Sequence, residues 1–139
     1  MSEVERWKRR SRENLRAAEI LSSQELLAES SVQSVSTFWN PAAARLYYSL
    51  FQAVVAKLID KNLTPADINC PDPGRWQHDS VKSACRRVLQ DRDLRTTYEV
   101  AMQLRERADY MPESPVQEPE FREIEESVRQ KLRTLGVAS

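Results

Sequence analysis

The sequence predicts an all-α protein, and three observations lead to this fold class. The chain of 139 residues contains only two glycines, which are the residues that tight β-hairpins favour. Few segments alternate apolar and polar residues as half-buried strands do. Several long stretches instead repeat apolar residues at spacings of three and four, the period of an amphipathic helix. The length, with 40% hydrophobic and 30% charged residues, predicts one compact domain over residues 1–139.

The first helix is expected over residues 4–27, with apolar residues near one side and charges on the other. Four basic residues share its polar side because steps of four return to nearly the same face. They are Lys8, Arg9, Arg12 and Arg16. This stripe has two interpretations: a solvated face partly neutralised by nearby glutamates, or a patch that binds nucleic-acid phosphates.

The central helix is expected over residues 40–61. Asn40 can cap its first turn, and Pro41 suits the first helical position because it has no amide hydrogen. Apolar residues cover much of its circumference, which predicts a central position in the fold. The preceding serine-rich segment, residues 29–39, is expected to be a loop anchored by Phe38 and Trp39.

Three further helices are expected over residues 76–90, 94–110 and 119–135. The segment before the first of them is predicted to be irregular because it contains three prolines and a glycine. Asp93 can cap the helix over residues 94–110. Gly136 is expected to end the last helix.

His78 is the only histidine, so proton transfer near neutral pH would use it first. A structural role for a lone histidine is the competing interpretation. Neither Cys70 nor Cys85 belongs to a motif with metal-ligand spacing, and Cys85 lies on an apolar helix face. We therefore expect no metal site and no cofactor.

The segment LRERADY, residues 104–110, concentrates charge at a helix end. Arg105 and Asp109 can form an ordinary intrahelical ion pair. Alternatively, Arg107 can offer its planar guanidinium to a phosphate while Asp109 and Tyr110 fix the surrounding geometry. The chain lacks glycine-rich phosphate loops and the common hydrolase motifs.

The two tyrosines Tyr47 and Tyr48 point to different sides of the central helix, so one can be buried while the other faces a cleft. Formal net charge is zero, which excludes a bulk electrostatic attraction to nucleic acid or membranes. No apolar run reaches the length of a membrane span, and no signal peptide is recognisable. A cytoplasmic location is expected.

Several segments appear in a familiar order: RAAEILSSQ, AARLYYSLFQAVVAKL, QHDSVKS, LRERADY and a charged amphipathic last helix. This order resembles the HEPN domain, a small helical module named for higher eukaryotes and prokaryotes nucleotide-binding. The resemblance implies an antiparallel up-and-down bundle of about five helices, usually a homodimer, often accompanied by a nucleotidyltransferase-like partner. Many HEPN proteins are metal-independent ribonucleases of toxin–antitoxin and defence systems.

The ribonucleases of this family carry an arginine followed four to six residues later by a histidine. Here His78 follows Arg75 with two residues between, and no histidine follows Arg105 or Arg107. The chain thus resembles the HEPN subgroup without the nuclease motif, for which nucleotide or RNA binding is expected. The implied ligand-binding residues are His78, Arg107, Asp109, Tyr110, Tyr48 and Arg45.

Two alternatives remain open. The first is a ribonuclease toxin in which His78 transfers the proton and Arg107 stabilises the phosphate, with help from Arg45. The second is a purely structural dimerisation domain. Whether the protein is an enzyme is therefore left open by the sequence.

Overall fold

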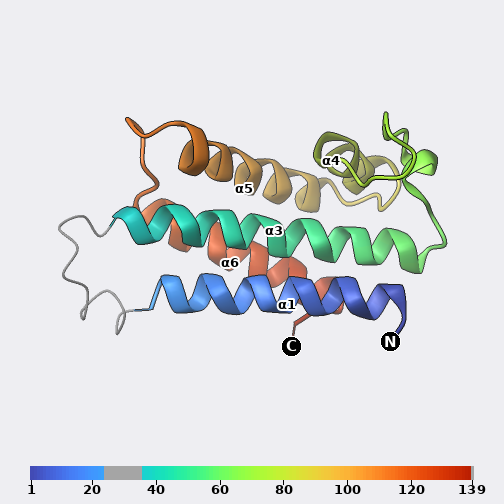
Figure 1. The fold of residues 1–139 in the computed structure, drawn as a ribbon, viewed down its shortest axis with the longest axis horizontal. Helices are drawn as coiled ribbons and strands as arrows, with labels where there is room; N and C mark the ends of the chain where they lie inside the picture. The colour runs from blue at the N-terminus through green and yellow to red at the C-terminus, as the bar shows by residue number, and fades with distance from the viewer. Residues whose placement is uncertain (24–35, 139) are drawn as a thin grey trace.

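The computed structural model describes residues 1–23 and 36–138, and within these ranges the chain is an all-α bundle without strands. Its elements are α1 (Glu3–Leu21), α3 (Ser36–Asp60), the short 3₁₀ helix η1 (Pro65–Ile68), α4 (His78–Arg87), α5 (Arg92–Tyr110) and α6 (Glu118–Thr134). Helices α1, α3, α5 and α6 alternate in direction, and the short α4 lies at one end of the bundle (Figure 1). No helix in the described part of the chain is long and apolar enough to cross a membrane.

Helix α3 is the centre of the bundle, as its apolar width predicts. It contacts α1, α4, α5 and α6, and its inward side chains are almost completely buried. They include Ala43, Leu46, Tyr47, Leu50, Phe51, Val54, Val55 and Leu58. Since every other α-helix of the described chain packs on α3, its side chains set the geometry of the site described below.

The start of α3 differs from the expectation. The helix begins at Ser36 and includes Pro41, so Asn40 is not its cap. The Asn40 side-chain oxygen instead accepts a hydrogen bond from the backbone amide of Val116, 2.9 Å away. Trp39 is buried against Phe121, with ring centroids 5.4 Å apart. Tertiary packing therefore holds a turn of helix where the serine-rich composition predicted a loop.

The end of α1 also comes earlier than expected. The helix ends at Leu21 and Ser22 caps it, with the Ser22 hydroxyl bonded to the Glu19 carbonyl. Serine side chains compete in this way with the backbone hydrogen bonds of a helix. The remaining predicted helical residues, 24–27, lie outside the described residues, as do residues 29–35 of the predicted loop.

Helix α4 is shorter than the predicted 76–90. Gln77 precedes its first residue, and Gln90 has a left-handed backbone (φ 55°) that is incompatible with a continuing helix. The cap of α5 is Asp91 rather than Asp93: the Asp91 carboxylate accepts from the Leu94 amide at 2.9 Å. Helix α6 lies close to its predicted range, and Gly136 follows it with φ 76°.

Candidate functional site

A cluster of hydrogen-bonded aromatic side chains surrounds His78 at the junction of α3, α4 and α5. His78 is the first residue of α4 and is half-buried. Its ring stacks on Phe51 with centroids 4.4 Å apart, and its Nδ1 atom is hydrogen-bonded to the hydroxyl of Tyr47. The imidazole is therefore fixed in orientation from two sides.

Tyr98 of α5 completes this hydrogen-bond network. Its hydroxyl lies 2.9 Å from that of Tyr47 and donates a bond of 2.9 Å to the backbone carbonyl of His78. Both tyrosines are fully buried, and burial raises the pKa of each hydroxyl well above its usual value. The two hydroxyls thus remain protonated at neutral pH.

The pKa of His78 is shifted in the opposite direction. Partial burial lowers it first, because desolvation disfavours the imidazolium, and the positive charge of Arg105 lowers it further, with Asp79 opposing. The folded protein therefore favours a neutral imidazole at physiological pH.

Arg105 is the cation of this cluster. One of its terminal nitrogens, Nη2, donates to the Tyr48 hydroxyl at 3.0 Å, and Nε lies 3.0 Å from the Asp109 carboxylate. The guanidinium carbon lies 5.4 Å from the Tyr48 ring centroid and 5.7 Å from that of Tyr110. The predicted Arg105–Asp109 ion pair is thus present, and the paired guanidinium lies close to two aromatic rings.

Tyr48 connects the arginine to the histidine. Its ring lies 6.2 Å from the His78 ring, centroid to centroid. Tyr110 at the end of α5 is 69% exposed, whereas the Arg105 side chain is 18% exposed. We call the four residues Tyr48, His78, Arg105 and Tyr110 the His–Arg cluster.

Arg107, which one of the two interpretations of LRERADY assigned to a phosphate, has other contacts in the structure. Its guanidinium forms a two-pronged ion pair with Glu120, with Nη2 3.0 Å from Oε1. It also donates to the backbone carbonyls of Ser114 and Pro115. These bonds fasten the α5–α6 connection to the start of α6. The geometry that the sequence assigned to Arg107, with Asp109 and Tyr110 around it, belongs to Arg105.

Arg45 is exposed, and its contact is with α1 rather than with the His–Arg cluster. Its Nη1 donates to the Asn14 side chain at 3.3 Å.

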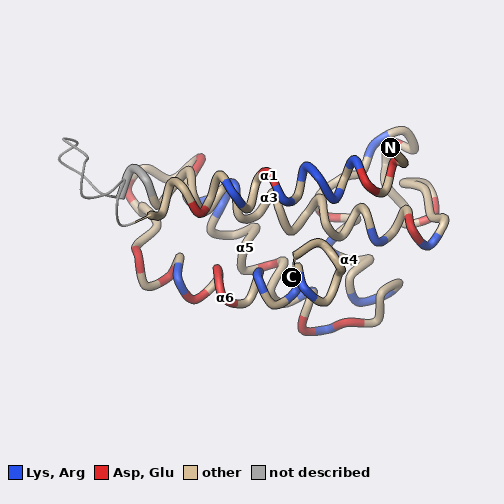
Figure 2. Tube along the Cα trace, turned by 90° about the horizontal axis from the view of Figure 1, so that it is seen from below, with Lys and Arg blue, Asp and Glu red and all other residues tan. Residues whose placement is uncertain are grey.

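The basic stripe on α1 is partly neutralised, as one of its two interpretations expects. Arg9 pairs with Glu13 and Arg16 with Glu19, at 3.1 and 3.2 Å. Arg12 is exposed, and Lys8 is half-buried. Figure 2 shows basic and acidic positions interspersed along the helices. The stripe keeps exposed cations but does not form a uniformly positive surface.

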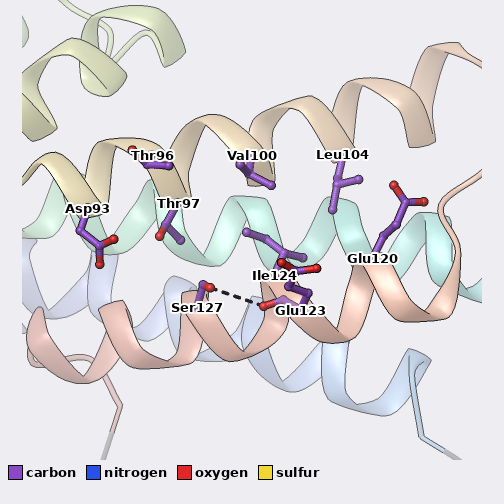
Figure 3. Close-up of a pocket in the computed structure, with 9 residues that line it drawn as sticks. All are labelled: Asp93, Thr96, Thr97, Val100, Leu104, Glu120, Glu123, Ile124 and Ser127. Carbon is purple, nitrogen blue, oxygen red and sulfur yellow. Dashed lines mark hydrogen bonds between the residues drawn. The ribbon is translucent and has the colours of Figure 1, made fainter.

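Two hollows lie near these elements. One of about 330 Å³ is lined by residues on either side of His78, from Pro71 to Ser80. A second, of about 320 Å³, lies between α5 and α6 and is separate from the His–Arg cluster (Figure 3). Its lining is Asp93, Thr96, Thr97, Val100, Leu104, Glu120, Glu123, Ile124 and Ser127.

Neither cysteine offers a reactive thiol. Cys85 is fully buried, as its apolar face predicts, and burial raises the pKa of its thiol to about 12. Cys70 is also buried. Within the described residues, no group of three or more His, Cys, Asp or Glu side chains is arranged to hold a metal ion.

The sequence analysis did not identify Tyr98 as a site residue. A signal was available, because a buried tyrosine needs a hydrogen-bond partner for its hydroxyl. In the structure the partners of the Tyr98 hydroxyl are the Tyr47 hydroxyl and the His78 backbone carbonyl.

No protein-family profile, curated protein or solved structure matches this chain.

Proposed function

We propose that this chain is a HEPN-like module that binds a nucleotide or a single-stranded RNA segment through the His–Arg cluster. One observation carries the proposal: the Arg105 guanidinium lies close to the rings of both Tyr48 and the exposed Tyr110, and the Tyr48 ring contacts the His78 ring. A positioned guanidinium suits a phosphate, and an exposed aromatic ring suits the face of a base.

The available hydrogen-bond donors of Arg105 support a phosphate ligand. Its Nη2 atom donates to the Tyr48 hydroxyl, and its buried Nε atom lies 3.0 Å from the Asp109 carboxylate without a hydrogen bond. Within the described residues Nη1 makes no hydrogen bond, and it is not among the fully buried side-chain atoms that lack a partner. Part of the Nη1 surface is therefore exposed, and an anion can contact it while Tyr48 and Asp109 hold the side chain.

The proposal is tested by fluorescence anisotropy with a labelled single-stranded RNA and competition by AMP. Arg105→Gln and Tyr110→Ala are each expected to weaken binding, Arg105→Gln by about tenfold or more, because a hydrogen bond to a charged group contributes roughly 1.5 to 3 kcal/mol. Arg133→Gln is the matched control, since it removes an exposed positive charge from α6. Absence of saturable binding by the wild type, or equal losses in all three variants, would reject the proposal.

A homodimer is part of the proposal and rests on the family resemblance. The mass in solution tests it directly: light scattering would give about twice the 16.1 kDa of one chain for a dimer. A nucleotidyltransferase-like protein is the partner that the same resemblance suggests, and co-purification of the tagged chain with such a protein would support this.

A metal-independent ribonuclease is the second candidate. It is favoured by the contacts of Tyr48, whose hydroxyl accepts from Arg105 at 3.0 Å and whose ring lies 6.2 Å from that of His78. An arginine and a histidine thus lie on either side of one tyrosine despite the missing motif. In this version Arg105, rather than Arg107, would stabilise the phosphate while His78 transfers the proton. An RNA degradation assay in EDTA decides the matter, since His78→Ala should abolish cleavage and equal activity in both proteins would exclude His78.

A further inference from the structure

Only one assignment of donors and acceptors satisfies the hydrogen bonds among Tyr98, Tyr47 and His78. The carbonyl oxygen of His78 can only accept a hydrogen bond, so Tyr98 donates its single hydroxyl proton to that carbonyl. Tyr98 must then be the acceptor in its contact with Tyr47, and Tyr47 must be the donor. The hydroxyl proton of Tyr47 is therefore not available for His78.

This assignment fixes the tautomer of the imidazole. The contact between Tyr47 and Nδ1 of His78 needs one proton, and only Nδ1 can supply it. A neutral imidazole has one N–H and one bare nitrogen, so Nε2 is the bare one. Tyr47 and Tyr98 act as positioning residues that leave Nε2 as a hydrogen-bond acceptor.

The Nε2 atom is not fully buried. It makes no hydrogen bond with any described residue, and it is not one of the fully buried side-chain atoms that lack a partner. His78 is half-buried and is one of the residues that line the hollow of about 330 Å³. A partly exposed acceptor that is fixed in orientation selects for a group that donates a hydrogen bond.

The geometry points to a specificity element: Tyr98 and Tyr47 hold His78 as the Nδ1–H tautomer, and Nε2 receives an N–H or O–H donor of the bound nucleotide. The second half of this inference rests on the proposed function, whereas the tautomer does not. Within AMP three groups supply such a donor: the ribose 2′-hydroxyl, the ribose 3′-hydroxyl and the exocyclic amine of the base. Sulfate carries no proton at neutral pH and lacks all three donors, so it should compete poorly.

The tautomer is measured by long-range ¹H–¹⁵N correlation spectra of the ¹⁵N-labelled full chain, at a pH above the pKa of His78. Because the chain has a single histidine, every imidazole signal belongs to His78. We expect a protonated Nδ1 and a bare Nε2 in the wild type. A protonated Nε2 in the neutral ring would overturn the inference.

Tyr98→Phe tests the cause. The substitution removes the oxygen that accepts the Tyr47 proton. The Tyr47 hydroxyl can then donate to Nδ1 of His78, so the proton of the neutral imidazole should be found on Nε2 instead of Nδ1. Tyr48→Phe is the matched control, because Tyr48 lies beside His78 without joining the network, and it should keep Nδ1–H. Should Tyr98→Phe fail to fold, Tyr47→Phe removes the same constraint and should abolish the strict Nδ1–H preference. An unchanged spectrum in the folded variant would refute the role of the tyrosines.

The ligand half is tested by comparing AMP with three analogues that each lack one donor: 2′-deoxy-AMP, 3′-deoxy-AMP and purine riboside monophosphate, which lacks the exocyclic amine. The analogue without the donor that Nε2 receives should bind about three- to tenfold more weakly. Equal affinity of all four nucleotides would overturn the ligand assignment and leave the tautomer standing. Absence of binding by all four would overturn the proposed function as well, while the spectra still decide the tautomer.

Discussion

His78 makes the stability of the fold depend on pH. Its pKa is lowered by burial and by Arg105, below the usual value of about 6.5, so the unfolded state binds a proton first on acidification. Stability should therefore decrease as the pH falls from about 6.5 to the folded-state pKa. Of the neighbouring groups, Tyr47 and Tyr98 titrate far above this window, and Asp79 opposes the shift.

Urea midpoints at pH values on both sides of this window provide the measurement. The wild type should lose more stability on acidification than His78→Gln, which cannot take up the proton. An equal loss in both proteins would show that other groups carry the pH dependence.

Arg107 should contribute to stability and not to ligand binding. Arg107→Gln removes the ion pair with Glu120 and the bonds to two loop carbonyls. Both side chains are partly exposed, at 27% and 39%, so the expected loss in free energy of unfolding is about 1 kcal/mol. RNA and AMP affinity should stay as in the wild type. If the variant instead had normal stability and weakened binding, Arg107 would be a ligand-binding residue.

The choice between Arg105 and Arg107 illustrates what could be derived from the sequence. Two arginines that are two positions apart on a helix point to opposite sides, so LRERADY by itself shows that they have different partners. The Arg105–Asp109 pair followed from the spacing of four. Which arginine faces α3 and His78 depends on the rotation of α5 in the bundle, which local spacing does not specify.

Helices α1 and α3 approach each other through a pair of buried serines. The Ser11 hydroxyl donates to the Ser49 carbonyl at 2.7 Å, and the Ser49 hydroxyl donates to the Ser11 carbonyl at 2.8 Å. Both side chains are completely buried. Small side chains thus allow close contact between the two helices while their hydroxyls remain satisfied.

This contact predicts a size-dependent response at position 49. Ser49→Ala should cost about 1 kcal/mol for the lost hydrogen bond. Ser49→Leu should cost more, about 2 kcal/mol or above, because it overpacks the helix contact. Ser83 is an exposed serine of α4, and the same two substitutions there should change stability by less than about 0.5 kcal/mol. Equal effects of alanine and leucine at position 49 would contradict the close approach.

Helix boundaries were less predictable than helix identities for reasons visible in particular residues. Asn40 and Pro41 form a good local start signal, but burial of Trp39 against Phe121 extends the helix beyond it. Asp91 and Asp93 are both competent caps by composition. Both carboxylates pair with Lys131 of α6, Asp93 at 2.9 Å and Asp91 at 3.3 Å, and Asp91 also accepts from the Leu94 amide. The contacts with Lys131 depend on tertiary structure. Long-range contacts therefore determine the helix boundaries that the local sequence signals do not specify.

The balanced charge of the whole molecule predicts a weak salt dependence of RNA binding. Net charge is zero, and the stripe on α1 is partly paired with glutamates. If Arg105 is the main phosphate ligand, the slope of log affinity against log salt should be close to about −0.7, the value for one phosphate of a single strand. Participation of the α1 stripe would make the slope about three to four times steeper.

Anisotropy titrations across a range of salt concentrations measure this slope, and paired substitutions assign it. Arg12→Gln combined with Arg16→Gln should leave the slope unchanged, because these exposed side chains belong to the stripe and not to the His–Arg cluster. Arg105→Gln should bring the slope towards zero along with its loss of affinity. The opposite pattern, a steep slope that the α1 variant flattens, would mean that RNA binds along α1 through the alternative phosphate-binding interpretation of that helix.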